Sequence, residues 1–245
     1  MRRGIIGDVH NNLKALEQIY DMLVTEGVDE IYHCGDLIDR GDDPEGVLKF
    51  CVDKKLKGVI GNHDEAILRK HVLTYEAPRK EDKYRSYAAM INVTGATEYL
   101  LSLPPILVFE DCKTIFTHAG IDPHKMIEDQ NTMCCYISMC NRSEPGMSRW
   151  WGVDRKGRYE DANRLEGWER WYNLYSFDYD VYAGHMTVKD PTRIEFPRSP
   201  GKYLTYIDTG AWYTGQLTAA IVGPNGFEKY VQTPKLREGA KYHAY

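Results

Sequence analysis

The stretch Ile5-Ile6-Gly7-Asp8-Val9-His10 joins a short apolar run to two side chains of the kinds that bind metal ions. Apolar runs of this length that end at glycine or a polar residue are typical of buried strands. Five later runs share the design: Ile31-Tyr32-His33-Cys34-Gly35-Asp36, Val59-Ile60-Gly61-Asn62-His63, Ile115-Phe116-Thr117-His118, Val181-Tyr182-Ala183-Gly184-His185 and Tyr206-Ile207-Asp208. Ligands of open α/β sheets collect beyond the carboxyl ends of the strands, so we expect these polar residues to converge on one metal site.

The segments between the first three runs indicate parallel strands. Apolar residues at helical spacing begin at Leu13, and Gly27 ends that predicted helix. Asp43 and Pro44 supply an N-cap and a first helical position for a second helix, which we expect to end near Lys54. The order βαβαβ implies parallel strands joined by helical crossovers.

The second half of the chain predicts antiparallel hairpins. Apolar runs at 107–109 and 114–116 flank Asp111-Cys112, and runs at 217–222 and 227–231 flank Pro224-Asn225-Gly226. Parallel units followed by hairpins predict an α/β fold, a layered α-β-β-α sandwich of two mixed sheets flanked by helices.

We expect one domain over residues 1–245, with two segments that fit neither pattern. Residues 75–87 are charged and irregular, which predicts a surface insertion. Residues 129–179 are rich in Trp and Tyr, and we expect this insertion to form a lid over the site. The alternative is that its aromatic residues fill a core.

Composition restricts the class of protein further. A formal net charge of −5 over 245 residues does not indicate a general electrostatic attraction to nucleic acid. The first strand follows Met1 almost at once and no apolar stretch approaches about 20 residues, so we expect a cytoplasmic protein without a membrane segment. The six cysteines show no C-x-x-C spacing, and Cys134, Cys135 and Cys140 are expected to be buried thiols on an apolar helix face. His33 lies inside a predicted strand and is expected to be packed.

The spacing of the polar residues indicates two metal ions. Asp8 and His10 lie two apart in an extended segment, so both can face one ion. Asp36 offers two oxygens and can bridge to a second ion, whose remaining ligands would be Asn62, His118 and His185. Oxygen and nitrogen ligands without thiolate suit Mn, Fe, Zn or Ni. Two ions about 3.5–4 Å apart activate a bridging water and hold a phosphoryl group, which predicts phosphoester hydrolysis.

Five blocks of the sequence carry a family resemblance: Gly7-Asp8-Val9-His10-Asn11, Gly35-Asp36-Leu37-Ile38-Asp39-Arg40-Gly41, Gly61-Asn62-His63-Asp64, Thr117-His118-Ala119-Gly120 and Gly184-His185. In order and spacing, the chain resembles the calcineurin-like metallophosphoesterases, in particular their phosphoprotein-phosphatase branch. The later stretch 207–219 resembles the bacterial and phage members, which include diadenosine tetraphosphatase-like enzymes. Asn11-Asn12, Met186 and Gln216 depart from the family pattern without removing a ligand.

The resemblance implies a role for each matching residue. The ligands of the two divalent ions, Mn²⁺ by preference, would be Asp8, His10, Asp36, Asn62, His118 and His185, with Asp36 as the bridge. His63 would protonate the leaving oxygen, and Asp39 would orient His63.

The resemblance also implies the contacts to substrate. Arg40 and Asn62 would bind the phosphate, together with a second arginine, for which we select Arg149 over Arg155 and Arg158. Asp208 would lie behind the ligands in a supporting role, such as orienting an imidazole.

The implied reaction is attack of a metal-bridging hydroxide on phosphorus. We expect phosphomonoesters, as in Ser/Thr phosphoproteins, to be the first substrate class and dinucleoside polyphosphates such as diadenosine tetraphosphate the second. An RNA 2′,3′-cyclic phosphate end would satisfy the same ion pair, although the acidic composition disfavours nucleic acid. A non-catalytic scaffold is a remote alternative, because the full ligand set is present.

Overall fold

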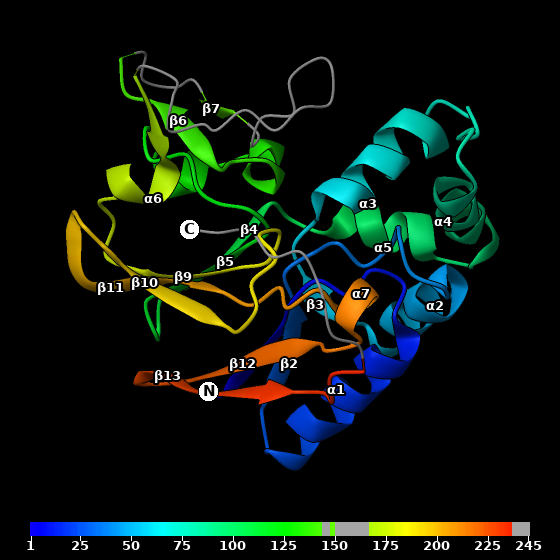
Figure 1. Cartoon of the computed structure of the whole chain (residues 1–245), viewed down its shortest axis with the longest axis horizontal. Coiled ribbons are helices and arrows are strands. Elements are labelled where there is room, and N and C mark those ends of the chain that lie inside the picture. The colour runs from blue at the N-terminus through cyan, green and yellow to red at the C-terminus, as the bar shows by residue number, and fades with distance from the viewer. Residues whose placement is uncertain (144–147, 150–166, 237–245) are drawn as a thin grey trace.

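The computed structural model describes residues 1–143, 148–149 and 167–236, and its centre is a pair of five-stranded mixed sheets (Figure 1). The first sheet has the order β13 (Gly226–Gln232), β12 (Thr218–Gly223), β1 (Arg3–Ile6), β2 (Glu30–His33), β3 (Lys57–Gly58). The second sheet has the order β10 (Thr192–Phe196), β11 (Ser199–Tyr206), β9 (Asp180–Ala183), β5 (Thr114–Thr117), β4 (Ile106–Phe109).

The predicted βαβαβ unit is present in the first sheet. Strand β1 pairs in parallel with β2, and β2 with β3. Helices α1 (Leu13–Thr25) and α2 (Pro44–Lys54) form the crossovers; Asn12 caps α1 and Asp43 caps α2. Strand β3 lies just before the run at Val59-Ile60 that was expected to form it, because the amide of Ile60 donates to Pro104 O instead of continuing the ladder.

The predicted hairpins are also present. Strands β4 and β5 pair antiparallel, as do β12 and β13. In the second sheet β5, β9 and β11 run parallel, so their carboxyl ends lie at one edge, and β4 and β10 flank them in the antiparallel sense.

Apolar side chains fill three layers around the sheets. Ile5 and Tyr32 of the first sheet pack with Phe116 and Tyr182 of the second, which seals the space between the sheets. The neighbouring Ile6 points the other way, into a cluster with α1 and α2. This alternation buries both faces of β1 and confirms the predicted sandwich.

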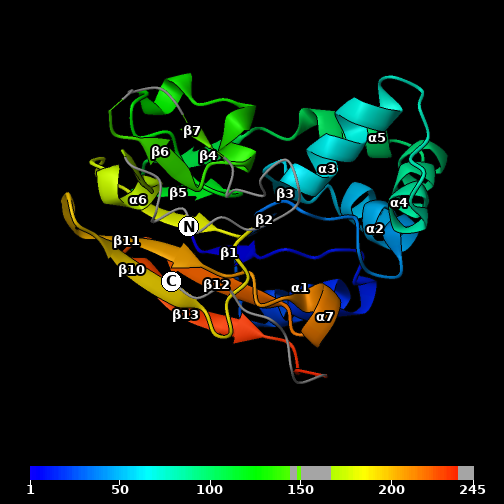
Figure 2. The same ribbon diagram turned by 45° about the horizontal axis from the view of Figure 1, so that its top comes forward.

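The remaining helices and short elements complete the layers. They are α3 (Asn62–Ile67), the π-helix Leu68–Val72, α4 (Glu81–Asn92), α5 (Ala96–Ser102), 3₁₀ turns at Ile127–Asp129 and Thr132–Cys135, α6 (Trp171–Leu174) and α7 (Ala211–Thr214). In both views α3, α4 and α5 gather beside α2 at one end of the molecule (Figure 2). Among the described helices, none combines the length and apolar character that a bilayer crossing requires.

The expectation for residues 75–87 is wrong in part. Most of this segment belongs to α4, whose residues Ala89 and Met90 are buried in the helical core. Residues 75–87 resemble a surface insertion because they are mostly charged. The apolar positions that α4 buries lie mostly beyond Tyr87. Helix α4 therefore brings residues of this segment to the site described below.

The described part of residues 129–179 packs on the outer face of the second sheet. It includes a small sheet of order β7 (Ser148–Arg149), β6 (Met139–Asn141), β8 (Trp168–Arg170). Trp171 and Tyr175 are fully buried, so these aromatic residues form core. Residues 144–147 and 150–166, with Trp150 and Trp151, lie outside the described residues, and the lid stays a prediction.

The three clustered thiols are buried and free, as expected. They do not share a helix face, however: Cys134 and Cys135 lie in a 3₁₀ turn and Cys140 lies in β6. His33 is packed as expected, with Nε2 2.8 Å from the Tyr99 hydroxyl and Nδ1 accepting from Gly35 N–H.

Candidate metal centre

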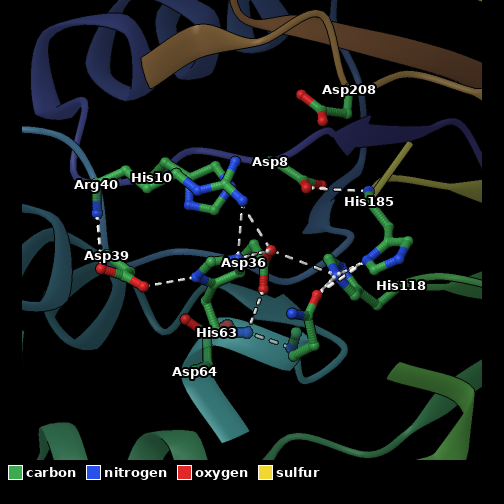
Figure 3. A network of polar contacts seen from close by, with 12 residues as sticks. Asp8, His10, Asp36, Asp39, Arg40, His63, Asp64, His118, His185 and Asp208 are labelled. Carbon is green, nitrogen blue, oxygen red and sulfur yellow. Dashed lines mark hydrogen bonds and ion pairs between the residues drawn. The ribbon is translucent and has the colours of Figure 1, made fainter. Parts of the chain in front are cut away.

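The predicted ligands meet at the carboxyl ends of parallel strands (Figure 3). The loop after β1 carries Asp8 and His10, the loop after β2 carries Asp36, and Asn62 and His63 open α3 just beyond β3. From the second sheet, His118 follows β5 and His185 follows β9. The two sheets thus contribute to one site because their parallel strands end at a common edge.

Asp36 lies at the middle of this cluster. Its Oδ2 is 3.6 Å from His10 Nε2 and 3.4 Å from His118 Nε2, on opposite sides of the carboxylate. Its Oδ1 accepts from the His63 amide at 2.8 Å. Asp36 is therefore placed to contact groups on both sides, as a bridging ligand would.

On one side of Asp36, three ligand atoms crowd together. Asn62 Oδ1 is 2.8 Å from His118 Nε2 and 2.9 Å from His185 Nδ1, and the two nitrogens are 3.2 Å apart. The Nδ1–H of His118 donates to Cys34 O at 2.7 Å, which leaves Nε2 to face the cluster. An amide oxygen and two imidazole nitrogens that converge in this way can each give a lone pair to one cation.

The charges of the cluster also favour a bound cation. Burial opposes a positive His118, but the nearby Asp36 and Asp8 raise the pKa of His118 to about 10. Burial also opposes ionisation of Asp36, and the imidazoles of His118 and His63 more than offset it, so its pKa lies well below the ordinary value. Burial holds the pKa of His10 near 3 and that of His185 well below its ordinary value, which keeps both neutral, the form in which imidazole binds metal.

Asp8 offers a further buried oxygen that could bind a cation. Its Oδ2 accepts from the His185 amide at 2.9 Å, while its Oδ1 is buried and has no hydrogen-bond partner among the described residues. Burial and the charge of Asp208 raise the pKa of Asp8. Gly184 is required beside it, because a Cβ at that position would collide with Asp8 Oδ1.

The turns that carry these residues are strained. His10, Asp36 and His185 have φ values of 47°, 48° and 64°, in the left-handed region that L-residues seldom occupy. Asp39 and Arg40 share this conformation, with φ of 75° each. Such strain persists only where the surrounding structure enforces it, and it collects at functional sites.

His63, Asp39 and Arg40 form a chain of polar contacts at the mouth of the cluster. His63 Nδ1 donates to Asp39 Oδ2 at 2.6 Å, and Arg40 Nη2 donates to His63 Nε2 at 3.0 Å. Burial raises the pKa of the Asp39 carboxyl, but His63 and Lys83 more than offset this and hold it at about 2. Asp39 is thus a buried anion in contact with His63 Nδ1, where it can fix the tautomer and direction of the ring; its orienting role stays a prediction.

Sequence reasoning missed three residues around these ligands. Asp64 is fully buried and accepts from the amides of Leu37 and Ile38, so it ties the loop of Asp36 to α3. Its position three residues after the N-cap, in a motif already singled out, was the available signal. Burial and the charge of Asp36 raise the pKa of Asp64 to about 6.

The other two missed residues come from α4. Ser86 Oγ accepts from the Asp39 amide at 3.1 Å, and Lys83 Nζ lies 3.5 Å from Asp39 Oδ2. Nothing in the local sequence marks these positions, because α4 reaches the Asp39 loop only through tertiary packing.

Two predicted residues behave differently from the rest. Asp208 accepts from Thr187 Oγ1 at 2.7 Å and from the Gly210 amide at 2.8 Å, and Figure 3 shows it apart from the imidazole rings. The bond from Thr187 joins the loop after β9 to the loop after β11, in which both Asp208 and Gly210 lie. Neither of these two bonds reaches an imidazole, and the supporting role of Asp208 stays a prediction. Arg149 lies in β7, opposite Met139, and its side chain lies outside what the structure describes, as do Arg155 and Arg158.

The donor set fits divalent metal ions. Atoms of His10, Asp36 and His63 lie within reach of one ion, and atoms of Asp8, Asp36 and His118 within reach of another. Carboxylate, amide and imidazole ligands without thiolate suit borderline divalent metals. The layered fold and this donor set agree with the class of metal-binding protein that the sequence predicts.

A family model for calcineurin-like phosphoesterases matches residues 1–202, and the chain belongs to this family. The chain is also 34% identical to the symmetrical bis(5′-nucleosyl)-tetraphosphatase of Hamiltonella defensa over 128 residues, which are 50% of this chain and 46% of that protein. The corresponding protein of Proteus mirabilis is 32% identical over 130 residues. The chain thus spans about half the length of the curated relatives that it matches.

A solved structure provisionally assigned as a diadenosine tetraphosphatase shares the fold. Its TM-score is 0.72 at 21% identity, and the match covers 97% of this chain and 95% of the other.

Proposed function

We propose that the protein is a two-metal phosphoesterase that hydrolyses dinucleoside polyphosphates such as diadenosine tetraphosphate. The cluster of Asn62 Oδ1, His118 Nε2 and His185 Nδ1 supports the metal centre most directly, because three atoms of the kinds that bind divalent metals converge within 3.2 Å of one another. As the sequence motifs predict, one ion would be held by Asp8, His10 and Asp36, and the other by Asp36, Asn62, His118 and His185. The structure itself gathers His10 with Asp36 and His63, and Asp8 with Asp36 and His118, so the division of ligands between the two ions stays a prediction. When bound, the two ions supply a water nucleophile at neutral pH and Lewis-acid stabilisation of the phosphoryl oxygens.

The side chains at the mouth perform the rest of the reaction. The Arg40 guanidinium binds the phosphoryl group, and its present contact with His63 Nε2 places both donors at the same point. With the substrate between them, His63 Nε2–H donates its proton to the oxygen that leaves phosphorus. The Asp39 anion stabilises the positive His63 before this transfer and holds its ring in place.

The substrate proposal rests on the relatives. The proteins of Hamiltonella defensa and Proteus mirabilis are both named as symmetrical bis(5′-nucleosyl)-tetraphosphatases. These names favour a dinucleoside polyphosphate as the substrate, the class that the sequence alone placed second. A phosphoprotein substrate stays a prediction, and Mn²⁺ stays the metal that we expect.

Turnover of three substrates tests the proposal. Chelator-treated protein should be inactive and should recover with Mn²⁺, and kcat/KM should be highest for diadenosine tetraphosphate, compared with a phosphopeptide and 2′,3′-cyclic AMP. Recovery with Fe²⁺, Zn²⁺ and Ni²⁺ in parallel identifies the preferred metal.

Two variants complete this test. Asp36→Asn keeps the shape of the bridging residue and should lower both bound metal and turnover, whereas Asp53→Asn, on the exposed side of α2, should change neither. A preference for the phosphopeptide would overturn the substrate proposal. Full turnover by the Asp36→Asn variant would overturn the metal centre.

A further inference from the structure

A cavity of about 380 Å³ opens beside the metal centre. Its wall includes Asn11 and Asn12, which follow the predicted ligand His10, and Asp42, which lies two residues beyond Arg40. Trp212 and Tyr213 of α7 also line it. The volume lies within the range of about 300–1,000 Å³ that is typical of small-ligand sites.

Trp212 connects this cavity to the phosphate-binding residue. Its ring centroid is 5.2 Å from Cζ of Arg40, and its ring packs edge-on against Tyr213 at 5.4 Å. Trp212 nevertheless remains 40% exposed and Tyr213 38% exposed, although both belong to a short helix directly behind the Asp208 loop. Two adjoining aromatic rings left open to solvent beside a phosphate-binding arginine offer a stacking surface for a planar group.

The position of these rings is fixed by their backbone. Thr214 Oγ1 donates to Gly210 O at 2.9 Å, and Asn12 Nδ2 donates to Ala211 O at 2.9 Å, which joins α7 to the start of α1. The aromatic wall is thus held to the loop that carries His10, and a group stacked on it would keep a defined distance from the metal centre.

The acidic lining of the cavity favours a nucleoside over a chain of phosphates. Glu17, Asp42 and Asp43 line it, with Lys14 as its one basic side chain among the residues described. Asp43 is already engaged as the N-cap of α2, while Glu17 and Asp42 are exposed. Carboxylates repel polyphosphate but accept hydrogen bonds from ribose hydroxyls and from exocyclic amines.

We propose that this cavity, the nucleoside pocket, binds one nucleoside of the substrate, with its base stacked on Trp212 and its ribose near Glu17 and Asp42. This inference rests on the proposed function, and it specifies which part of a dinucleoside polyphosphate the chain recognises outside the phosphoryl group. The bound phosphoryl group lies at Arg40, and the nucleoside attached through the phosphate chain extends past Trp212.

Kinetics on substrates with and without a nucleobase provide the first test. Trp212→Ala should lower kcat/KM for diadenosine tetraphosphate about tenfold or more, mainly through KM, because stacking contributes strongly to the binding of each base. The same variant should lower kcat/KM for inorganic tetrapolyphosphate, which has the anhydride but no base, less than threefold. Trp212→Phe should restore most of the loss, and Tyr84→Ala, which removes an exposed ring on α4, serves as the matched control.

Calorimetric titration of the metal-loaded protein with adenosine, which carries no phosphate, provides the second test. Wild type and Trp212→Phe should bind adenosine, and Trp212→Ala should bind it at least tenfold more weakly. Equal losses on diadenosine tetraphosphate and tetrapolyphosphate would overturn the pocket, since Trp212 would then act only through Arg40.

The two tests separate the pocket from the proposed function. Efficient hydrolysis of diadenosine tetraphosphate that is insensitive to Trp212→Ala would overturn the pocket and leave the function standing. Binding of adenosine that depends on Trp212, without hydrolysis of any dinucleotide, would support the pocket and reject the function.

Discussion

Replacement of Asp39 by Asn tests the proposed proton donor most sharply. The Asp39 carboxylate accepts from His63 Nδ1 at 2.6 Å, and its side chain is 3% exposed. Asn has nearly the same shape and tolerates the left-handed φ of 75° at this position, so the change removes charge without reshaping the loop. The positive form of His63, which carries the proton for the leaving oxygen, should lose its main stabilising partner.

The size of this effect follows from the geometry. Two unit charges about 4 Å apart interact by about 4 kcal/mol at an effective dielectric constant of about 20. The His63 side chain is 17% exposed, so we reduce this figure to about 2–4 kcal/mol. At about 1.4 kcal/mol for each factor of ten, kcat should fall roughly 30- to 1,000-fold where the leaving group needs a proton.

Two aryl esters provide the assay. Phenyl phosphate releases a basic leaving group that needs protonation, whereas p-nitrophenyl phosphate releases one that departs as the anion. The Asp39→Asn variant should therefore show the full loss on phenyl phosphate and less than a tenfold loss on p-nitrophenyl phosphate, with unchanged metal content and circular dichroism. Equal losses on the two esters would refute the assignment of His63 as the acid that Asp39 supports.

Three further predictions concern the surroundings of the site. Gly184→Ala should displace Asp8, lower the free energy of unfolding by about 1–3 kcal/mol and reduce the metal content measured by plasma mass spectrometry; full metal occupancy would contradict the packing argument. Ser86→Ala leaves the Asp39 amide without its acceptor, so denaturant unfolding should report a loss of about 1–3 kcal/mol, and an unchanged midpoint would show that water replaces the hydroxyl. Burial lowers the pKa of His33 from 6.5 to about 3, so its contribution to stability is complete above pH 6.5 and is lost as the pH falls toward 3. The unfolding free energy should then decline by up to about 1.4 kcal/mol per pH unit in this window, and a His33→Gln variant with the same slope would show that another group titrates.

Local patterns in the sequence determined the elements of this protein. The caps at Asn12 and Asp43, the turn at Gly226 and the apolar run from Ile5 act over a few residues, so their structures could be predicted directly. The ligands were predicted in the same way, since each lies within a few residues of the end of a strand. The exception among the elements was α4, whose charged first half resembles a loop until its packing against α2 is known.

The sequence by itself determined which side chains can bind metal and where each stands along a strand, because those features depend on neighbours in the chain. Only the tertiary structure decided that Asp208 accepts from Thr187 of a neighbouring loop, that Ser86 and Lys83 reach Asp39, and that Trp212 stands beside Arg40. These contacts join segments that are far apart in the chain, and they arise from how the two sheets and their helices pack. No local periodicity encodes such distances, which is why the contacts that support the ligands had to be found in three dimensions.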